Sequence, residues 1–164
     1  MRAVILSILL LFSSGLLAED QSIQKVAQYS IGERGSKHFE LFGFYQKTAN
    51  QAIKIEYSYG KYAEQYIPLS YLGETKVNGQ PAFKVKFPNG YRLTIIPQKD
   101  LSLIIKDKQG KYNKHFKWMY EGPVNGVGTY CSSCAQDEKE AMQILVNDFL
   151  GIKARMNHGS LEWL

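Results

Sequence analysis

The sequence has few of the residues on which catalytic and metal sites usually depend. It contains two cysteines and three histidines, and no two histidines stand at a spacing typical of metal ligands. It has no Gly-x-Ser-x-Gly motif, and its glycine-rich run over residues 122–128 is not followed by Lys-Ser or Lys-Thr. We therefore expect no α/β-hydrolase site, no phosphate-binding loop, no metal and no cofactor. The histidines in question are His38, His115 and His158.

No segment of the chain concentrates charge of one sign. Lys and Arg number 20 against 15 Asp and Glu, which gives a formal net charge of +5, and the lysines are scattered along the sequence. Nucleic-acid-binding surfaces instead show clustered Lys and Arg. We therefore expect no nucleic-acid partner. Weak attraction to an anionic membrane or polysaccharide is the remaining electrostatic alternative.

A hydrophobic leader opens the chain. Met1-Arg2 precedes an apolar run from Ala3 to Ala18, and Glu19-Asp20 follows it. The run is shorter than the roughly 20 residues that a helix needs to cross a bilayer. This pattern predicts a signal peptide over residues 1–18 and a periplasmic or secreted protein without a transmembrane segment after cleavage. An uncleaved membrane anchor is the alternative.

The rest of the chain shows no sign of a second domain. It has no internal repeat, no low-complexity tract and no linker, so we expect one β-rich domain over residues 19–152 and a short tail over 153–164. Ile23, Val26 and Ala27 stand at helical spacing and predict a short helix over 19–28. The glycine-rich and charged segment 31–37 is expected to be a loop.

Alternation of apolar and polar residues dominates the middle of the chain. Side chains of a strand alternate between two faces, so this period predicts antiparallel strands with one face in water. Asn78-Gly79 and Asn89-Gly90 favour tight reversals between them. We predict an antiparallel meander of about seven strands, curled into an open barrel or a strongly twisted sheet. The alternating segments are 53–59, 83–87, 91–96, 101–106 and 116–120.

Segment 38–46 departs from this alternation because both of its faces are apolar. Phe39 and Leu41 stand on one face, and Phe42 and Phe44 on the other. Two interpretations remain open. Gly43 either marks a bulge or a sharp bend, or the strand is buried on both sides.

A helix is predicted from Asp137 to Leu150. Asp137 is a suitable N-cap, and Glu140 three residues later completes a capping-box-like pair. Ala141, Met142 and Leu145 belong to an apolar stripe that must be buried against another element. The apolar face of the sheet, or one open end of a barrel, is the available partner. The predicted fold is therefore mainly β with one C-terminal helix packed on it.

The only two cysteines, Cys131 and Cys134, lie shortly before this helix. In an oxidising compartment such a pair favours a disulfide, which would fix the turn into the helix. A Cys-x-x-Cys redox centre is the alternative. The surrounding pattern is not βαβ, and the nearby carboxylates of Asp137 and Glu138 disfavour a thiolate. Ala135 stands where a c-type haem motif requires histidine.

Tyrosine is the most suggestive residue type, with 11 in the chain. It combines flat apolar area with a polar tip, which suits ligand contact, but it also has high β propensity. The candidate ligand-binding residues are Tyr57, Tyr59, Tyr62, Tyr66 and Tyr71.

We hypothesise an exported, non-catalytic envelope protein that binds a small ligand or a partner protein through a Tyr-rich sheet. Two alternatives stay open. One is a periplasmic thiol–disulfide oxidoreductase that uses Cys131 and Cys134. The other is an accessory subunit of an envelope or secretion assembly, with Trp163 and the tail as a contact.

Overall fold

The computed structural model describes most of the chain beyond the predicted leader. The described residues are 25–46, 54–119, 135, 137–149, 154–157 and 160–163. The predicted signal peptide over 1–18 lies outside them, and so do Cys131 and Cys134. The predictions of a cleaved leader and of a disulfide therefore remain predictions.

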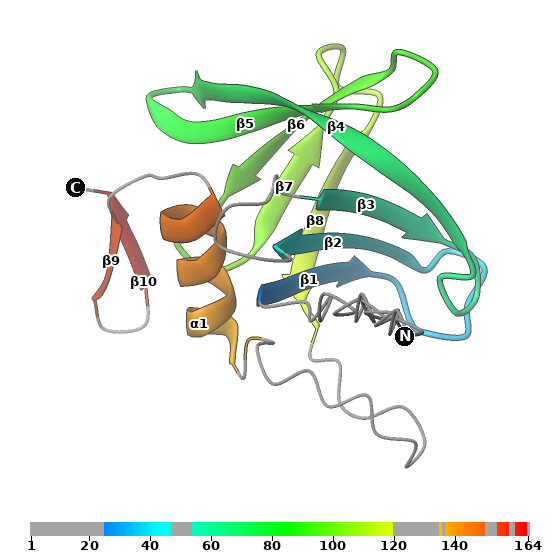
Figure 1. Ribbon diagram of the computed structural model, residues 1–164, viewed down its shortest axis with the longest axis horizontal. Coiled ribbons are helices and arrows are strands. Elements are labelled where there is room, and N and C mark those ends of the chain that lie inside the picture. The colour runs from blue at the N-terminus through cyan, green and yellow to red at the C-terminus, as the bar shows by residue number, and fades with distance from the viewer. Residues whose placement is uncertain are drawn as a thin grey trace, which may run out of the picture.

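Eight antiparallel strands close into a barrel in the order in which they occur along the chain (Figure 1). The predicted meander is confirmed, and the sheet is closed rather than open. Tyr29 and Ser30 of the first strand pair with Trp118 and Lys117 of the last. The strands are β1 (Lys25–Ile31), β2 (Glu40–Gln46), β3 (Lys54–Tyr59), β4 (Gln65–Val77), β5 (Gln80–Lys86), β6 (Arg92–Pro97), β7 (Leu103–Lys106) and β8 (Asn113–Trp118).

Large apolar side chains occupy the interior of the barrel. Residues directly opposite one another in paired strands share a face of the sheet. Phe42 lies opposite both Tyr29 and Tyr57, so all three point inward. Phe42 also meets Phe116 edge to face, with ring centroids 5.1 Å apart. Such filling is typical of a barrel of eight strands. Other fully buried side chains of the core are Phe83, Ile55, Ile95, Leu103, Ile105 and Val85.

Strand β2 is buried on both faces, which was one of the two interpretations of its sequence. Phe39, just before the strand, and Leu41, within it, are buried, although their side chains belong to the other face of the strand from Phe42. Gly43 keeps its register with both neighbouring strands, so the prediction of a bulge there is wrong. The absence of a Cβ at Gly43 instead leaves room for the ring of Tyr45. The irregularity of the sheet lies in β4, between residues 71 and 73.

The helix predicted over residues 19–28 is wrong where the structure describes it. Residues from Lys25 onward form β1, which pairs along its whole length with β2. Ala27 and Tyr29 alternate with Gln28 and are buried in the core. Burial of this face against the barrel outweighs the helical spacing of Ile23, Val26 and Ala27.

The predicted C-terminal helix is confirmed and covers one end of the barrel (Figure 1). Helix α1 (Glu138–Gln143) continues as a π-helix, η1 (Ile144–Phe149). The side chain of Asp137 accepts a hydrogen bond from the Glu140 N–H at 2.8 Å, as its predicted role of N-cap requires. Met142 and Leu145 belong to the same core cluster as the inward side chains of the strands.

The C-terminal tail forms a second, two-stranded sheet. Strands β9 (Ala154–Asn157) and β10 (Ser160–Trp163) pair antiparallel. Leu161 is buried, and its N–H donates to the carbonyl of Lys99 in the β6–β7 turn at 3.2 Å. Trp163 packs partly buried against the core. Within the part of the chain that the structure describes, no helix combines the length and the hydropathy that a bilayer crossing requires.

Candidate functional site

A partly buried ion pair lies inside the barrel near the end that faces away from α1. Glu40 begins β2 on the same face as Phe42, and its side chain is 12% exposed. Lys114 of β8 lies opposite Ile105, whose side chain is buried in the core, and therefore also points inward. The Lys114 Nζ forms an ion pair with Glu40 Oε1. The barrel thus holds two opposite charges at inward positions, and each compensates the other.

Two tyrosines surround this ion pair. The Tyr112 hydroxyl donates to Glu40 Oε2 at 2.7 Å, and the Lys114 Nζ lies 4.9 Å from the centroid of the Tyr112 ring. Burial and then the Glu40 carboxylate raise the pKa of Tyr112 above its ordinary value, and the same two causes raise the pKa of Tyr57. Both phenols therefore keep their protons and remain hydrogen-bond donors at neutral pH.

Aromatic rings lead from the ion pair to the surface. Tyr57 stacks on Tyr59, with ring centroids 5.8 Å apart and planes inclined by 22°. Tyr57 also meets Phe87 at 5.5 Å, and Phe87 packs against Tyr91 at 6.0 Å. The Tyr91 hydroxyl donates to Asp107 Oδ2 at 2.8 Å. We call these four rings the aromatic rim.

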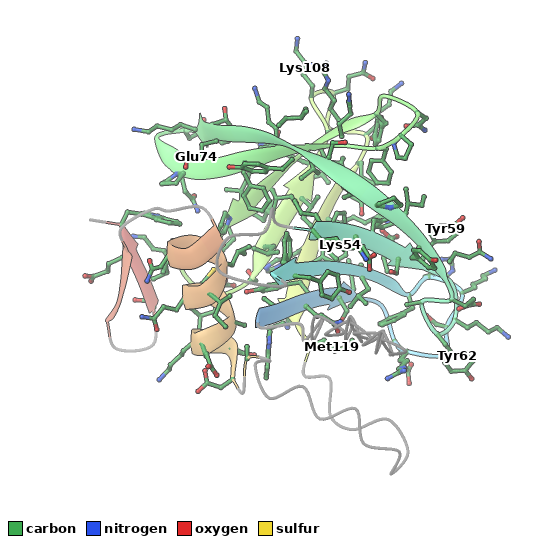
Figure 2. The ribbon with its side chains drawn as sticks, in the orientation of Figure 1. Lys54, Tyr59, Tyr62, Glu74, Lys108 and Met119 are labelled. Atoms are coloured by element: carbon green, nitrogen blue, oxygen red, sulfur yellow. The ribbon has the colours of Figure 1, made fainter. Side chains whose placement is uncertain are left out.

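The rim is accessible at its outer members. Tyr59 is 40% exposed, and Tyr91 is exposed to a similar degree. Figure 2 shows Tyr59 at the end of the barrel opposite α1, with Tyr62 close to the same end. A molecule that approaches this end would therefore meet the rings of Tyr59 and Tyr91, and the Lys114 side chain is also partly accessible.

The structure brings together only some of the tyrosines singled out in the sequence. Tyr57 and Tyr59 form the stacked pair, and Tyr62 lies in the neighbouring β3–β4 turn, 65% exposed. Tyr66 lies opposite Ser58 on the outer face of the barrel and is 70% exposed. Tyr71 lies farther along β4, where its ring is 6.1 Å from that of Phe83.

The charged members of the site did not emerge from the sequence, although a signal for them exists. Glu40 occupies the same face of its strand as Phe42, and Lys114 the same face as Phe116. A charged residue in the apolar register of a strand points into the core, where it needs a partner. An ion pair between these two residues of opposite charge could therefore have been predicted from the sequence.

The site has the groups to bind a ligand, and its carboxylate is already engaged. Both oxygens of Glu40 have partners, Lys114 and Tyr112. Lys114 has three N–H donors, and its side chain is 37% exposed, so it retains donors for a ligand. Among the described residues, no group of three His, Cys, Asp or Glu side chains could hold a metal ion.

The chain matches no known family model, no curated protein and no solved structure.

Proposed function

We propose that this protein is an exported, non-catalytic barrel that binds a small ligand at the aromatic rim. The observation that carries the proposal is the stacked pair Tyr57–Tyr59 beside the ion pair Glu40–Lys114, at the end of the barrel away from α1. Small-ligand sites combine apolar and aromatic surface with a few fixed polar groups, and this end of the barrel has both.

The chemistry of the rim favours a saccharide as the ligand. The exposed face of Tyr59 offers a flat apolar surface, against which the less polar face of a sugar ring can lie. The remaining donors of Lys114 can then bond to a ring or hydroxyl oxygen. Because the Glu40 carboxylate holds Lys114 and itself accepts the Tyr112 hydroxyl, little ordering is needed on binding.

The direct test is binding of the intact protein to an array of neutral and acidic oligosaccharides, followed by calorimetry on those retained. We expect Tyr59→Ala to weaken binding by at least tenfold. Tyr66→Ala is the matched control, because it removes an equal and more exposed ring from the outer face. Absence of any bound oligosaccharide, or an equal loss in both variants, would overturn the proposal.

A further inference from the structure

A concave surface lies on the outside of the barrel, across β5, β6 and β7. It is a groove of about 760 Å³. Lys84 lies opposite Thr94, and Thr94 opposite Lys106, so these three outward side chains form a row across three strands. Neighbouring strands are about 4.8 Å apart, which places the two lysine Cα atoms roughly 10 Å from each other.

Three more cations complete the lining of this groove. Arg92 precedes Thr94 by two residues on the same face of β6, and Lys76 lies near the end of β4. Lys108 belongs to the β7–β8 turn, and Figure 2 shows it projecting at the top of the view. Lysines that appear scattered in the sequence are thus gathered by the strand register onto one surface. We call these five residues the basic groove: Lys76, Lys84, Arg92, Lys106 and Lys108.

Little negative charge balances the basic groove. Asp107 is the one acidic residue that lines it, and that side chain is buried and accepts the Tyr91 hydroxyl at 2.8 Å. None of the five cations forms an ion pair with another residue in the described part of the chain. Their mutual repulsion would be relieved by an anion bound in the groove.

The donors present fit phosphate groups. Arg92 can bond a phosphate through two parallel N–H groups, whereas the lysines act as point charges. The Thr94 hydroxyl and the Asn113 amide add neutral donors to the same lining. The volume lies within the range of small-ligand sites, which is about 300–1,000 Å³. The five cations exceed the charge of a single phosphate, so the groove matches a ligand that carries several phosphate groups.

We propose that the basic groove binds a ligand that carries two or more phosphate groups. This site lies on the outer face of the barrel and does not depend on saccharide binding at the aromatic rim. The phosphates could belong to a soluble compound or to a lipid headgroup, and both sources present the same chemistry to the groove.

The experiment measures binding of the intact protein to two probes, tripolyphosphate by calorimetry and cardiolipin vesicles by sedimentation. Vesicles of phosphatidylcholine and the tricarboxylate citrate serve as reference ligands. We expect binding to tripolyphosphate, to cardiolipin, or to both, with an affinity that falls as salt is raised. Binding to tripolyphosphate alone identifies a soluble source, binding to cardiolipin alone identifies a lipid source, and binding to both supports the groove as a site for either.

Two triple variants with the same change of charge separate a specific site from general attraction. Lys84→Gln, Arg92→Gln and Lys106→Gln together should weaken binding at least tenfold. Replacing three exposed loop lysines outside the groove with Gln should leave it nearly unchanged. Equal losses, no binding to either probe, or citrate binding as tight as tripolyphosphate would overturn the proposal. Tyr59→Ala should bind tripolyphosphate normally, which separates this result from the test of the rim. The control lysines are Lys37, Lys61 and Lys99.

Discussion

At the scale of single residues, Lys114 occupies an inward position that the alternation of β8 would give to an apolar side chain. Its Nζ is held by Glu40, and both side chains have left most of the water they would meet in the unfolded chain. In Lys114→Met, the carboxylate keeps the Tyr112 hydroxyl but loses its compensating charge. We expect the free energy of unfolding to fall by about 1–3 kcal/mol, measured by urea denaturation.

Lys117→Met is the matched control for this prediction. Lys117 lies on the same strand, faces outward and is exposed. Its replacement should change the free energy of unfolding by no more than about 0.5 kcal/mol. Similar losses in the two variants would mean that the Glu40–Lys114 pair adds nothing to stability.

Gly32 is a second residue whose identity is constrained by the structure. Its φ is +82°, and a Cβ there would lie 2.6 Å from the carbonyl oxygen of His38. Gly110 has a φ of +74°, with nothing within 4 Å of the corresponding position. Gly110→Ala should therefore lower the free energy of unfolding by about 1 kcal/mol, because the new side chain is strained only by the positive φ. Gly32→Ala must in addition displace backbone atoms. We expect the loss in Gly32→Ala to be at least twice as large in thermal or urea unfolding. Equal losses would show that the β1–β2 loop shifts without cost.

At the scale of elements, the strands with clean alternation were predictable and the others were not. β5 and β6 alternate over residues 83–87 and 91–95, and an Asn-Gly pair precedes each of them, so their place follows from these local signals. The sequence predicts a helix at the start of β1 because Ile23, Val26 and Ala27, two of which lie within the strand, have a spacing close to that of a helix. Only the pairing of Tyr29 with both Phe42 and Trp118 shows why this segment is extended.

The β9–β10 hairpin could not be predicted for a similar reason. Its sequence has no regular alternation, and its attachment depends on Leu161 reaching the β6–β7 turn. Contacts between segments so far apart in the chain leave no local pattern. The helix, in contrast, carried its own signals, an N-cap and an apolar stripe, and both are confirmed.

The cap of α1 supports a prediction at this scale. Asp137 accepts the Glu140 N–H, which would otherwise lack a partner in the first turn. Asp137→Ala should lower the free energy of unfolding by about 1 kcal/mol, measured by urea denaturation. Asp137→Asn keeps an oxygen acceptor and should lose much less. If both variants lost the same amount, the charge of Asp137 rather than its hydrogen bond would be responsible.

At the scale of the whole molecule, both binding surfaces are products of barrel closure. Glu40 and Lys114 are 74 residues apart in the sequence and meet only because β2 and β8 belong to one closed sheet. The basic groove likewise arises from register, which sets Lys84 and Lys106 on either side of Thr94. The sequence singled out Tyr57 and Tyr59, because tyrosine is visible by composition, but it could not show which partners the fold would bring to them.

Closure also buries phenols, and this predicts how stability depends on pH. Burial raises the pKa of Tyr29, Tyr57 and Tyr112 above the ordinary value of 10.0. The folded barrel therefore holds these protons at a pH at which the unfolded chain releases them. Their contribution to stability is fully present below pH 10 and is lost as the pH rises above it. Urea denaturation at a series of pH values should show the free energy of unfolding falling on the alkaline side.

The contribution of one phenol can be isolated by comparing variants that differ from the wild type at a single tyrosine. Tyr112→Phe removes the hydroxyl whose proton is held by burial and by Glu40. The free energy of unfolding of this variant should therefore fall less steeply on the alkaline side. Tyr66→Phe removes an exposed phenol on the outer face and should leave the fall close to that of the wild type. A fall of the same steepness in both variants would mean that water reaches Tyr112 freely. In that case the end of the barrel away from α1 would be open to water as far as the Tyr112 hydroxyl and the Glu40 carboxylate that accepts from it.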